Sequence, residues 1–75
     1  MKIVKYKAFT VYVYANDHSP PHCHVRYNDG SEISVDLPFL KPRYGATFTK
    51  EVEEVLELNL NKLCEAWGKL NPLKN

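Results

Sequence analysis

All three histidines of the chain lie between His18 and His24, and two adjacent prolines separate the first histidine from the other two. Imidazole nitrogens bind transition metals, and imidazole also transfers protons near neutral pH. His22 and His24 are two residues apart, so on a strand they share one face, about 7 Å apart. The stretch therefore predicts a site for metal binding or for proton transfer.

For a metal site, we expect His18, His22 and His24 to be the ligands, with Zn²⁺ as the candidate ion. Asp17 or Asp36 is an alternative third ligand. Asp36 has a second candidate role, in which its carboxylate accepts a hydrogen bond from His24 and fixes the tautomer of that ring.

Acid–base catalysis on an anionic substrate such as RNA is a different hypothesis. In it, the catalytic candidates are His24, oriented by Asp36, and Arg26, which would hold a phosphate or carboxylate group. Tyr12 and Tyr14 would stack a base. The net charge of only +1 argues against a strong RNA binder. Whether the chain is an enzyme stays open at this point.

The leading hypothesis is a binding module that docks another molecule on this face. Tyr, His and Arg side chains are common in interface hot spots. The candidate binding residues are Tyr12, Tyr14, Asp17, His18, His22, His24 and Arg26. A core this small gains stability from a partner, so we expect a cognate small protein or a homodimer. The plain alternative is that the histidines only hydrogen-bond loop carbonyls and the tyrosines are ordinary exposed strand residues.

Four stretches alternate between apolar and polar residues and predict strands. They run from Lys2 to Lys7, Phe9 to Ala15, His22 to Asn28 and Glu32 to Leu37. Pro38 ends the last of them, and residues 39–48 are expected to form a loop because they contain Pro42 and Gly45.

The Asp29-Gly30 turn, with a loop of three or five residues, keeps the apolar and polar faces of its hairpin apart. The pairs expected on this basis are Tyr27 with Ile33, Val25 with Val35, Cys23 with Leu37, Arg26 with Ser34 and His24 with Asp36. In the preceding hairpin they are Val13 with Val25, Ala15 with Cys23, Tyr14 with His24 and Tyr12 with Arg26.

Two sheet faces follow from these pairs. The apolar face carries Val11, Val13, Ala15, Cys23, Val25, Ile33, Val35 and Leu37. The open, polar face carries Tyr12, Tyr14, His22, His24, Arg26, Ser34 and Asp36. A helix is expected to cover the apolar face.

From Thr49 onward the apolar residues recur at helical spacing, which predicts one amphipathic helix from about Lys50 to Leu70. Thr49 is the expected N-cap, and Trp67 belongs to the buried stripe. The expected fold is α+β, a single domain over residues 1–75. It has an antiparallel meander of three to four strands with one C-terminal helix packed on one face.

The stretch from Asn16 to Tyr27 resembles the signature of a small prokaryotic family called domain of unknown function 4160. That signature is an acidic residue, histidine, a short spacer, Pro-Pro-His, an apolar or aromatic residue and His-Val. The strand with Tyr12 and Tyr14, the helix near Trp67 and the closing Pro72-Leu73 agree with it. Cys23 departs from it, because the family more often has a larger residue there, and residues 39–47 match no family feature.

The resemblance implies no established activity. Members of the family are often encoded beside another small domain, and some such pairs are described as toxin–antitoxin modules. The resemblance thus implies that this chain is one partner of such a pair. We also expect a cytoplasmic protein without a membrane segment, since no apolar run reaches transmembrane length and no signal peptide opens the chain. Cys23 and Cys64 are expected to be buried free thiols.

Overall fold

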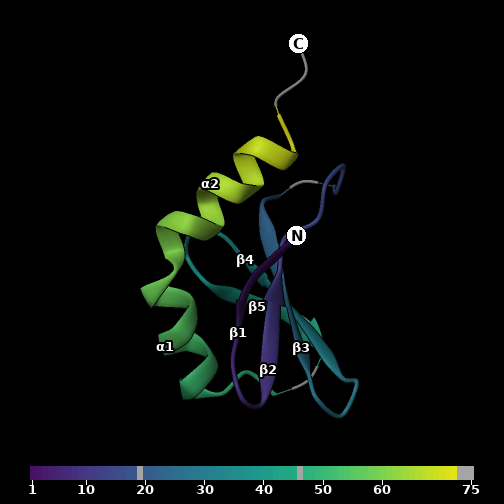
Figure 1. Ribbon diagram of the computed structural model, residues 1–75, viewed down its shortest axis with the longest axis vertical. Coiled ribbons are helices and arrows are strands. Elements are labelled where there is room, and N and C mark those ends of the chain that lie inside the picture. The colour runs from purple at the N-terminus through teal and green to yellow at the C-terminus, as the bar shows by residue number, and fades with distance from the viewer. Residues whose placement is uncertain (19, 46, 73–75) are drawn as a thin grey trace.

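The computed structural model describes residues 1–18, 20–45 and 47–72. Five strands, joined in sequence order, form one antiparallel sheet. They are β1 (Lys2–Lys5), β2 (Phe9–Tyr12), β3 (His22–Tyr27), β4 (Glu32–Asp36) and β5 (Lys41–Gly45), and they are followed by α1 (Lys50–Leu58) and α2 (Leu60–Leu70). Both helices lie along the same side of the sheet (Figure 1). The α+β class is confirmed, whereas the expected three to four strands and single helix are wrong.

The additional strand is β5, in the stretch expected to be a loop. Pro42 has no N–H to donate, so it is tolerated at the edge of a sheet but not in its centre. β5 is an edge strand, since it pairs only with β4. Pro42 lies opposite Val35, next to an irregularity in the ladder between Ser34 and Val35. The edge position and the bulge together accommodate a residue that suggested a loop.

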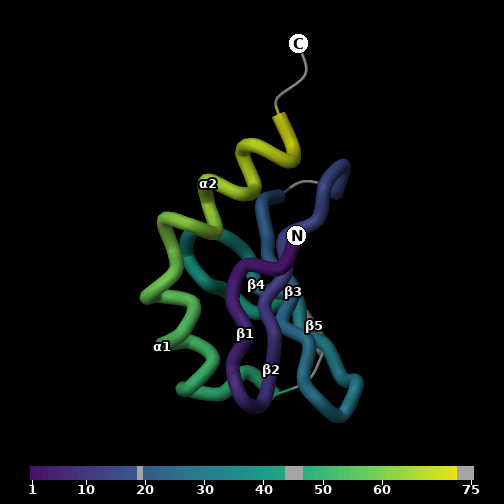
Figure 2. The backbone as a smooth tube through the Cα atoms, in the orientation of Figure 1, coloured from purple at the N-terminus to yellow at the C-terminus, as the bar shows by residue number. Residues whose placement is uncertain are grey.

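The predicted helix is divided in two at Asn59. This residue has φ −110° and ψ 14°, outside the helical region, and its side-chain amide donates to the Val55 carbonyl at 2.8 Å. An asparagine side chain that bonds a nearby carbonyl competes with the helix backbone in this way. The path of the chain changes direction between α1 and α2 (Figure 2). At the start of α1, Thr49 is the predicted N-cap, and its hydroxyl accepts from the Val52 N–H at 3.2 Å.

The strand register differs by two residues from the expected one in both central hairpins. Between β3 and β4, His24 lies opposite Ser34 and His22 lies opposite Asp36. Between β2 and β3, Tyr12 lies opposite His24. The expected pairing of His24 with Asp36 and of Tyr14 with His24 is therefore wrong.

The turn between β3 and β4 explains the two-residue difference in the register of the β3–β4 hairpin. The Tyr27 N–H donates to the Ser31 carbonyl at 2.8 Å, which closes a loop of residues 28–30. Gly30 in this loop has φ +93°, a conformation that favours glycine. The expected pairs required the longer, five-residue loop. A slip of two residues leaves every side chain on its original face, so the assignment of faces survives the wrong register.

The apolar sheet face and the helix stripe form one core, which includes the fully buried Phe9, Val11, Val25, Leu56 and Leu63. Trp67 is in this core, as predicted. Ala15 was expected on the buried face but is exposed, because β2 ends at Tyr12 and Ala15 belongs to a turn.

Both cysteines are free thiols, as expected, but only Cys23 is buried; Cys64 is exposed on α2. Among the residues that the structure describes, no helix has the length and apolar character needed to cross a membrane.

Candidate metal centre

Three side chains come together here, Asp17 from the loop between β2 and β3 and His22 and His24 from β3. Asp17 Oδ2 lies 3.0 Å from His22 Nε2 and 3.2 Å from His24 Nε2. The three atoms all lie within 4.8 Å of one another. A tetrahedral ion with bonds of about 2.0–2.1 Å holds its ligand atoms about 3.3 Å apart. The two distances from Asp17 Oδ2 are therefore close to the edge length of such a coordination shell.

The hydrogen bond on the other side of the His22 ring determines what its Nε2 can do. His22 Nδ1 lies 2.7 Å from the Pro20 carbonyl oxygen. A carbonyl only accepts, so Nδ1 carries the proton in this contact. In the neutral ring, Nε2 then presents a lone pair to a carboxylate oxygen of Asp17. Two acceptors at 3.0 Å require a cation between them, either a proton or a metal ion.

The His24 ring repeats this arrangement. Its Nδ1 lies 3.0 Å from Glu32 Oε2, a carboxylate oxygen that accepts, and its Nε2 faces Asp17 Oδ2. Metal-binding histidines usually donate their other ring N–H to a carboxylate or a backbone carbonyl. Here His22 donates to a carbonyl and His24 to a carboxylate. Both rings thus have the orientation that metal-binding histidines adopt.

Asp17 is fixed by hydrogen bonds to Asn71, at the end of α2, and to the neighbouring His18. Its backbone N–H donates to Asn71 Oδ1 at 2.7 Å, and Asn71 Nδ2 donates to the Tyr14 carbonyl at 2.9 Å. Its Oδ1 accepts from the His18 N–H at 2.9 Å. The preceding Asn16 has φ +57°, in the left-handed region that asparagine tolerates. The C-terminal end of α2 therefore fixes the loop that carries the carboxylate.

Burial alone would raise the pKa of the Asp17 carboxyl. When the two rings are protonated, the hydrogen bonds from the His24 side chain and the His18 N–H, together with the charges of His22 and His24, outweigh burial and lower that pKa. The carboxylate is thus maintained in its ionised form, which is the form that binds metal.

His22 departs from the expectation of an open face. Its side chain is 1% exposed, and its ring centroid lies 5.1 Å from that of Trp67 on α2. His22 is the first residue of β3, and the last turns of α2 lie near that end of the strand (Figure 1). Ser34, also expected on the open face, is 8% exposed. The site therefore has a closed side under Trp67, whereas His24, at 18% side-chain exposure, is on its more accessible side.

His18, a predicted ligand, lies at the rim of the site rather than in the group of three. Its side chain is 70% exposed, its Nδ1 lies 3.0 Å from Asp17 Oδ1 rather than Oδ2, and its ring centroid lies 5.1 Å from that of His22. The structure thus groups Asp17, the alternative ligand, with His22 and His24.

Asp36 does not contact the His24 ring. Its Oδ1 lies 3.2 Å from Arg43 Nε, close enough for an ion pair but without the angles of a hydrogen bond. Within the described part of the chain, this buried oxygen has no hydrogen-bond partner. The carboxylate beside His24 Nδ1 is instead Glu32, which sequence analysis missed. The three-residue loop would have revealed it, because that loop places Glu32 diagonally from His24.

A row of aromatic rings continues from His24 across β2. The Tyr14 ring lies 4.7 Å from the His24 ring, and the Tyr12 ring stacks on Tyr14 at 5.8 Å with an interplanar angle of 15°. Arg26 is exposed on the same face. A shallow hollow of about 220 Å³ adjoins this row and is lined by His24, Glu32, Ile33 and Ser34. The predicted binding residues Tyr12, Tyr14 and Arg26 therefore border the histidine group.

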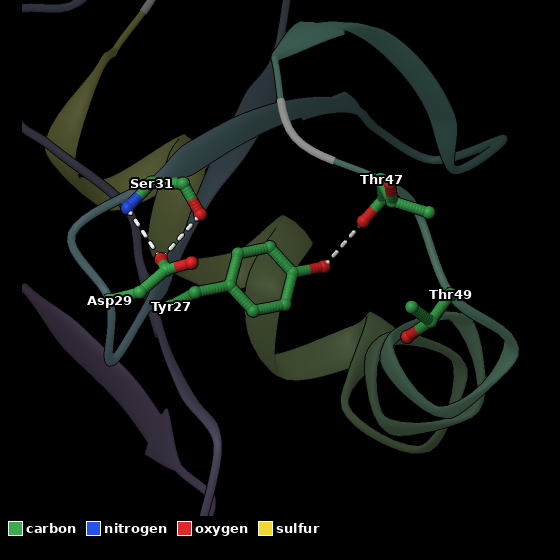
Figure 3. Close-up of a pocket in the computed structure, with 5 residues that line it drawn as sticks. All are labelled: Tyr27, Asp29, Ser31, Thr47 and Thr49. Carbon is green, nitrogen blue, oxygen red and sulfur yellow. Dashed lines mark hydrogen bonds between the residues drawn. The ribbon is translucent and has the colours of Figure 1, made fainter.

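A second hollow lies at the β3–β4 turn (Figure 3). The Tyr27 hydroxyl donates to the Thr47 carbonyl at 2.8 Å, and Asp29 Oδ1 accepts from the N–H and hydroxyl of Ser31. Thr49 completes the lining. These hydrogen bonds join lining groups to one another, and none of the lining residues belongs to the histidine group.

Comparison with known proteins gives one match. The family model described as Domain of unknown function (DUF4160) matches residues 8–68, a range that includes Asp17, His22 and His24 and ends before Asn71. No curated protein and no solved structure shows a significant match.

Proposed function

We propose that this chain, which belongs to the family described as Domain of unknown function (DUF4160), binds a divalent transition-metal ion through Asp17, His22 and His24. One observation carries the proposal. The Nε2 atoms of two histidines converge on a single carboxylate oxygen, while an acceptor already engages the Nδ1 proton of each ring. A metal ion at this point accepts both imidazole lone pairs and the carboxylate charge together.

The donor set narrows the identity of the ion. Two imidazoles and one carboxylate suit Zn²⁺ and the neighbouring first-row ions, whereas Mg²⁺ and Ca²⁺ prefer oxygen alone. Three protein ligands leave at least one coordination position for water or another ligand, as in catalytic zinc sites. Pro20 and Glu32 act from the outer shell by orienting the rings. A bound ion in such a site supplies Lewis acidity at its open position.

The competing explanation for the geometry is a proton in place of the ion. A protonated His22 facing Asp17 forms a buried ion pair, and the site is then purely structural. Metal titration separates the two explanations, because Zn²⁺ displaces the proton and saturates a metal centre, whereas a purely structural ion pair takes up no Zn²⁺.

The two functional hypotheses from sequence remain predictions. The first is a binding module that docks a cognate protein, as one half of a toxin–antitoxin pair, or forms a homodimer. A metal ion with an open coordination position fits this hypothesis, because a side chain of the partner could become the additional ligand. For the RNA-cleaving hypothesis, the position of Asp36 removes the proposed orienting group of His24. Glu32 occupies that place instead.

The test is calorimetric titration of chelator-stripped protein with Zn²⁺. We expect one site per chain with micromolar or tighter affinity. Asp17→Asn preserves shape but removes the charge, and it should weaken binding at least tenfold. His22→Ala with His24→Ala should abolish binding, and His18→Ala should change it only a few-fold. Circular dichroism establishes that each variant is folded. Unchanged Zn²⁺ affinity in Asp17→Asn and in the double variant would overturn the proposal.

A further inference from the structure

The observed strand register places two opposite charges across from one another on the open face, but they form no ion pair. Arg26 of β3 lies directly opposite Glu32 of β4, where opposite charges usually pair across strands. Glu32 Oε2 instead contacts His24 Nδ1 at 3.0 Å. Within residues 1–18, 20–45 and 47–72, Arg26 has no carboxylate partner at ion-pairing distance. Its guanidinium is therefore exposed and available to an external anion.

The position of Arg26 relates it to the candidate metal centre. It is two residues beyond His24 on β3, so its Cα lies about 7 Å along the same face. The shallow hollow lined by His24, Glu32 and Ser34 adjoins this part of the face. This spacing along the strand would allow one phosphate group to contact both the guanidinium and an ion held by Asp17, His22 and His24.

Tyr12 supplies a surface for a ring. It lies directly opposite His24 in the β2–β3 ladder, and one side of its ring stacks on Tyr14. Tyr12 is half-buried, which limits the rotamer freedom that ligand binding has to remove. Stacking of a base on such an aromatic side chain contributes about 1–3 kcal/mol, which corresponds to a roughly fivefold to hundredfold change in affinity.

We propose that the open face beside the metal centre binds a nucleoside phosphate. The phosphate lies between the bound ion and Arg26, and the base lies against Tyr12. This inference rests on the proposed metal function, because Asp17 and Glu32 would repel a phosphate if no ion offset their charge. The net charge of +1 favours one nucleotide unit over a long strand, which requires many cationic contacts. The unit is either a free nucleotide or the end of a single strand.

The test uses the full chain saturated with Zn²⁺ and three probes: adenosine monophosphate, inorganic phosphate and adenosine. We expect adenosine monophosphate to bind at least tenfold more tightly than either of the others, and to lose this affinity when chelator removes the ion. Arg26→Gln should lower the affinity for adenosine monophosphate and for phosphate, but not the affinity for adenosine. Tyr12→Leu should lower the affinity for adenosine monophosphate and for adenosine, but not the affinity for phosphate.

Arg43→Gln is the matched control, because Arg43 is a cation on the edge strand β5, beyond β4, and its side chain already pairs with Asp36. It should leave the affinity for adenosine monophosphate unchanged. A Zn²⁺-loaded protein that does not bind adenosine monophosphate, or one whose affinity is equal in Arg26→Gln and Arg43→Gln, overturns the nucleotide proposal alone. A protein that takes up no Zn²⁺ in the same titration overturns the metal function and the phosphate contact with it.

A short single-stranded oligonucleotide with a terminal phosphate distinguishes the two sources of the ligand. Tighter binding than adenosine monophosphate assigns the site to a strand end, and equal or weaker binding assigns it to a free nucleotide.

Discussion

The proton on Nδ1 of each site histidine determines which chemistry its Nε2 performs. In His22 a backbone carbonyl holds that proton, and in His24 the Glu32 carboxylate holds it. Sequence analysis named His22 and His24 as candidates from their spacing, and named Asp17 only as an alternative to His18 for the third ligand. It did not identify Glu32 or Pro20 as their partners, since these contacts depend on the strand register and on the path of the loop.

Glu32→Gln tests the contact between His24 Nδ1 and the Glu32 carboxylate, because it replaces one carboxylate oxygen by an amide nitrogen. A neutral amide oxygen still accepts from Nδ1 but makes the imidazole a weaker ligand, so we expect Zn²⁺ affinity to fall by about 10–100-fold. Glu57→Gln, on the exposed face of α1, is the matched control and should leave the affinity unchanged. Equal Zn²⁺ affinities in the two variants would show that Glu32 does not support the site.

The two cysteines differ in environment, and thiol chemistry should report it. Burial raises the pKa of Cys23 to about 12, so it forms almost no thiolate at neutral pH, while Cys64 is exposed. We expect a disulfide reagent at pH 8 to label one thiol of the native protein rapidly and the second only in denaturant. Cys64→Ser should remove the rapid phase. Rapid labelling that persists in Cys64→Ser would contradict the burial of Cys23.

At the scale of elements, the sequence predicted the sheet faces except at Ala15, the apolar helix stripe and the end of the helical segment at Leu70. These depend on side-chain periodicity, which local sequence contains. It did not predict β5 or the break at Asn59. Pro42 favours a loop unless an edge position is available, and Asn59 breaks the helix only when its side chain bonds the Val55 carbonyl. Both outcomes depend on tertiary context.

The contact between α2 and the Asp17 loop predicts an effect on metal binding from outside the ligand set. Asn71→Asp removes the amide donor to the Tyr14 carbonyl and places a second negative charge near Asp17. We expect Zn²⁺ affinity to fall at least fivefold, because the carboxylate loses its fixed position. Asn61→Asp, at an exposed position of the same helix, is the control for charge. Calorimetry that gives one affinity for both variants would remove Asn71 from the site.

For the whole molecule, 75 residues provide a small core, and such a core contributes only about 3–5 kcal/mol of stability. A ligand that binds only the folded chain raises the free energy of unfolding. The increase depends on the ratio of the free ligand concentration to Kd, and it is about 2.7 kcal/mol when this ratio is one hundred. We therefore expect saturating Zn²⁺ to raise the Tm of the chelator-stripped protein by at least several degrees. Asp17→Asn should show little of this rise. An equal rise in Asp17→Asn would mean that Zn²⁺ stabilises the fold from another place.

The most direct measurement of the metal centre is X-ray absorption at the zinc edge of the stoichiometric complex. Coordination by Asp17, His22 and His24 predicts nitrogen and oxygen ligands at about 2.0–2.1 Å and the scattering pattern of two imidazole rings. The spectrum should contain no sulfur, because Cys23 is buried on the other face of the sheet and the exposed Cys64 of α2 is outside the group of three. A sulfur ligand at about 2.3 Å, or a shell without imidazole, would contradict the proposed site.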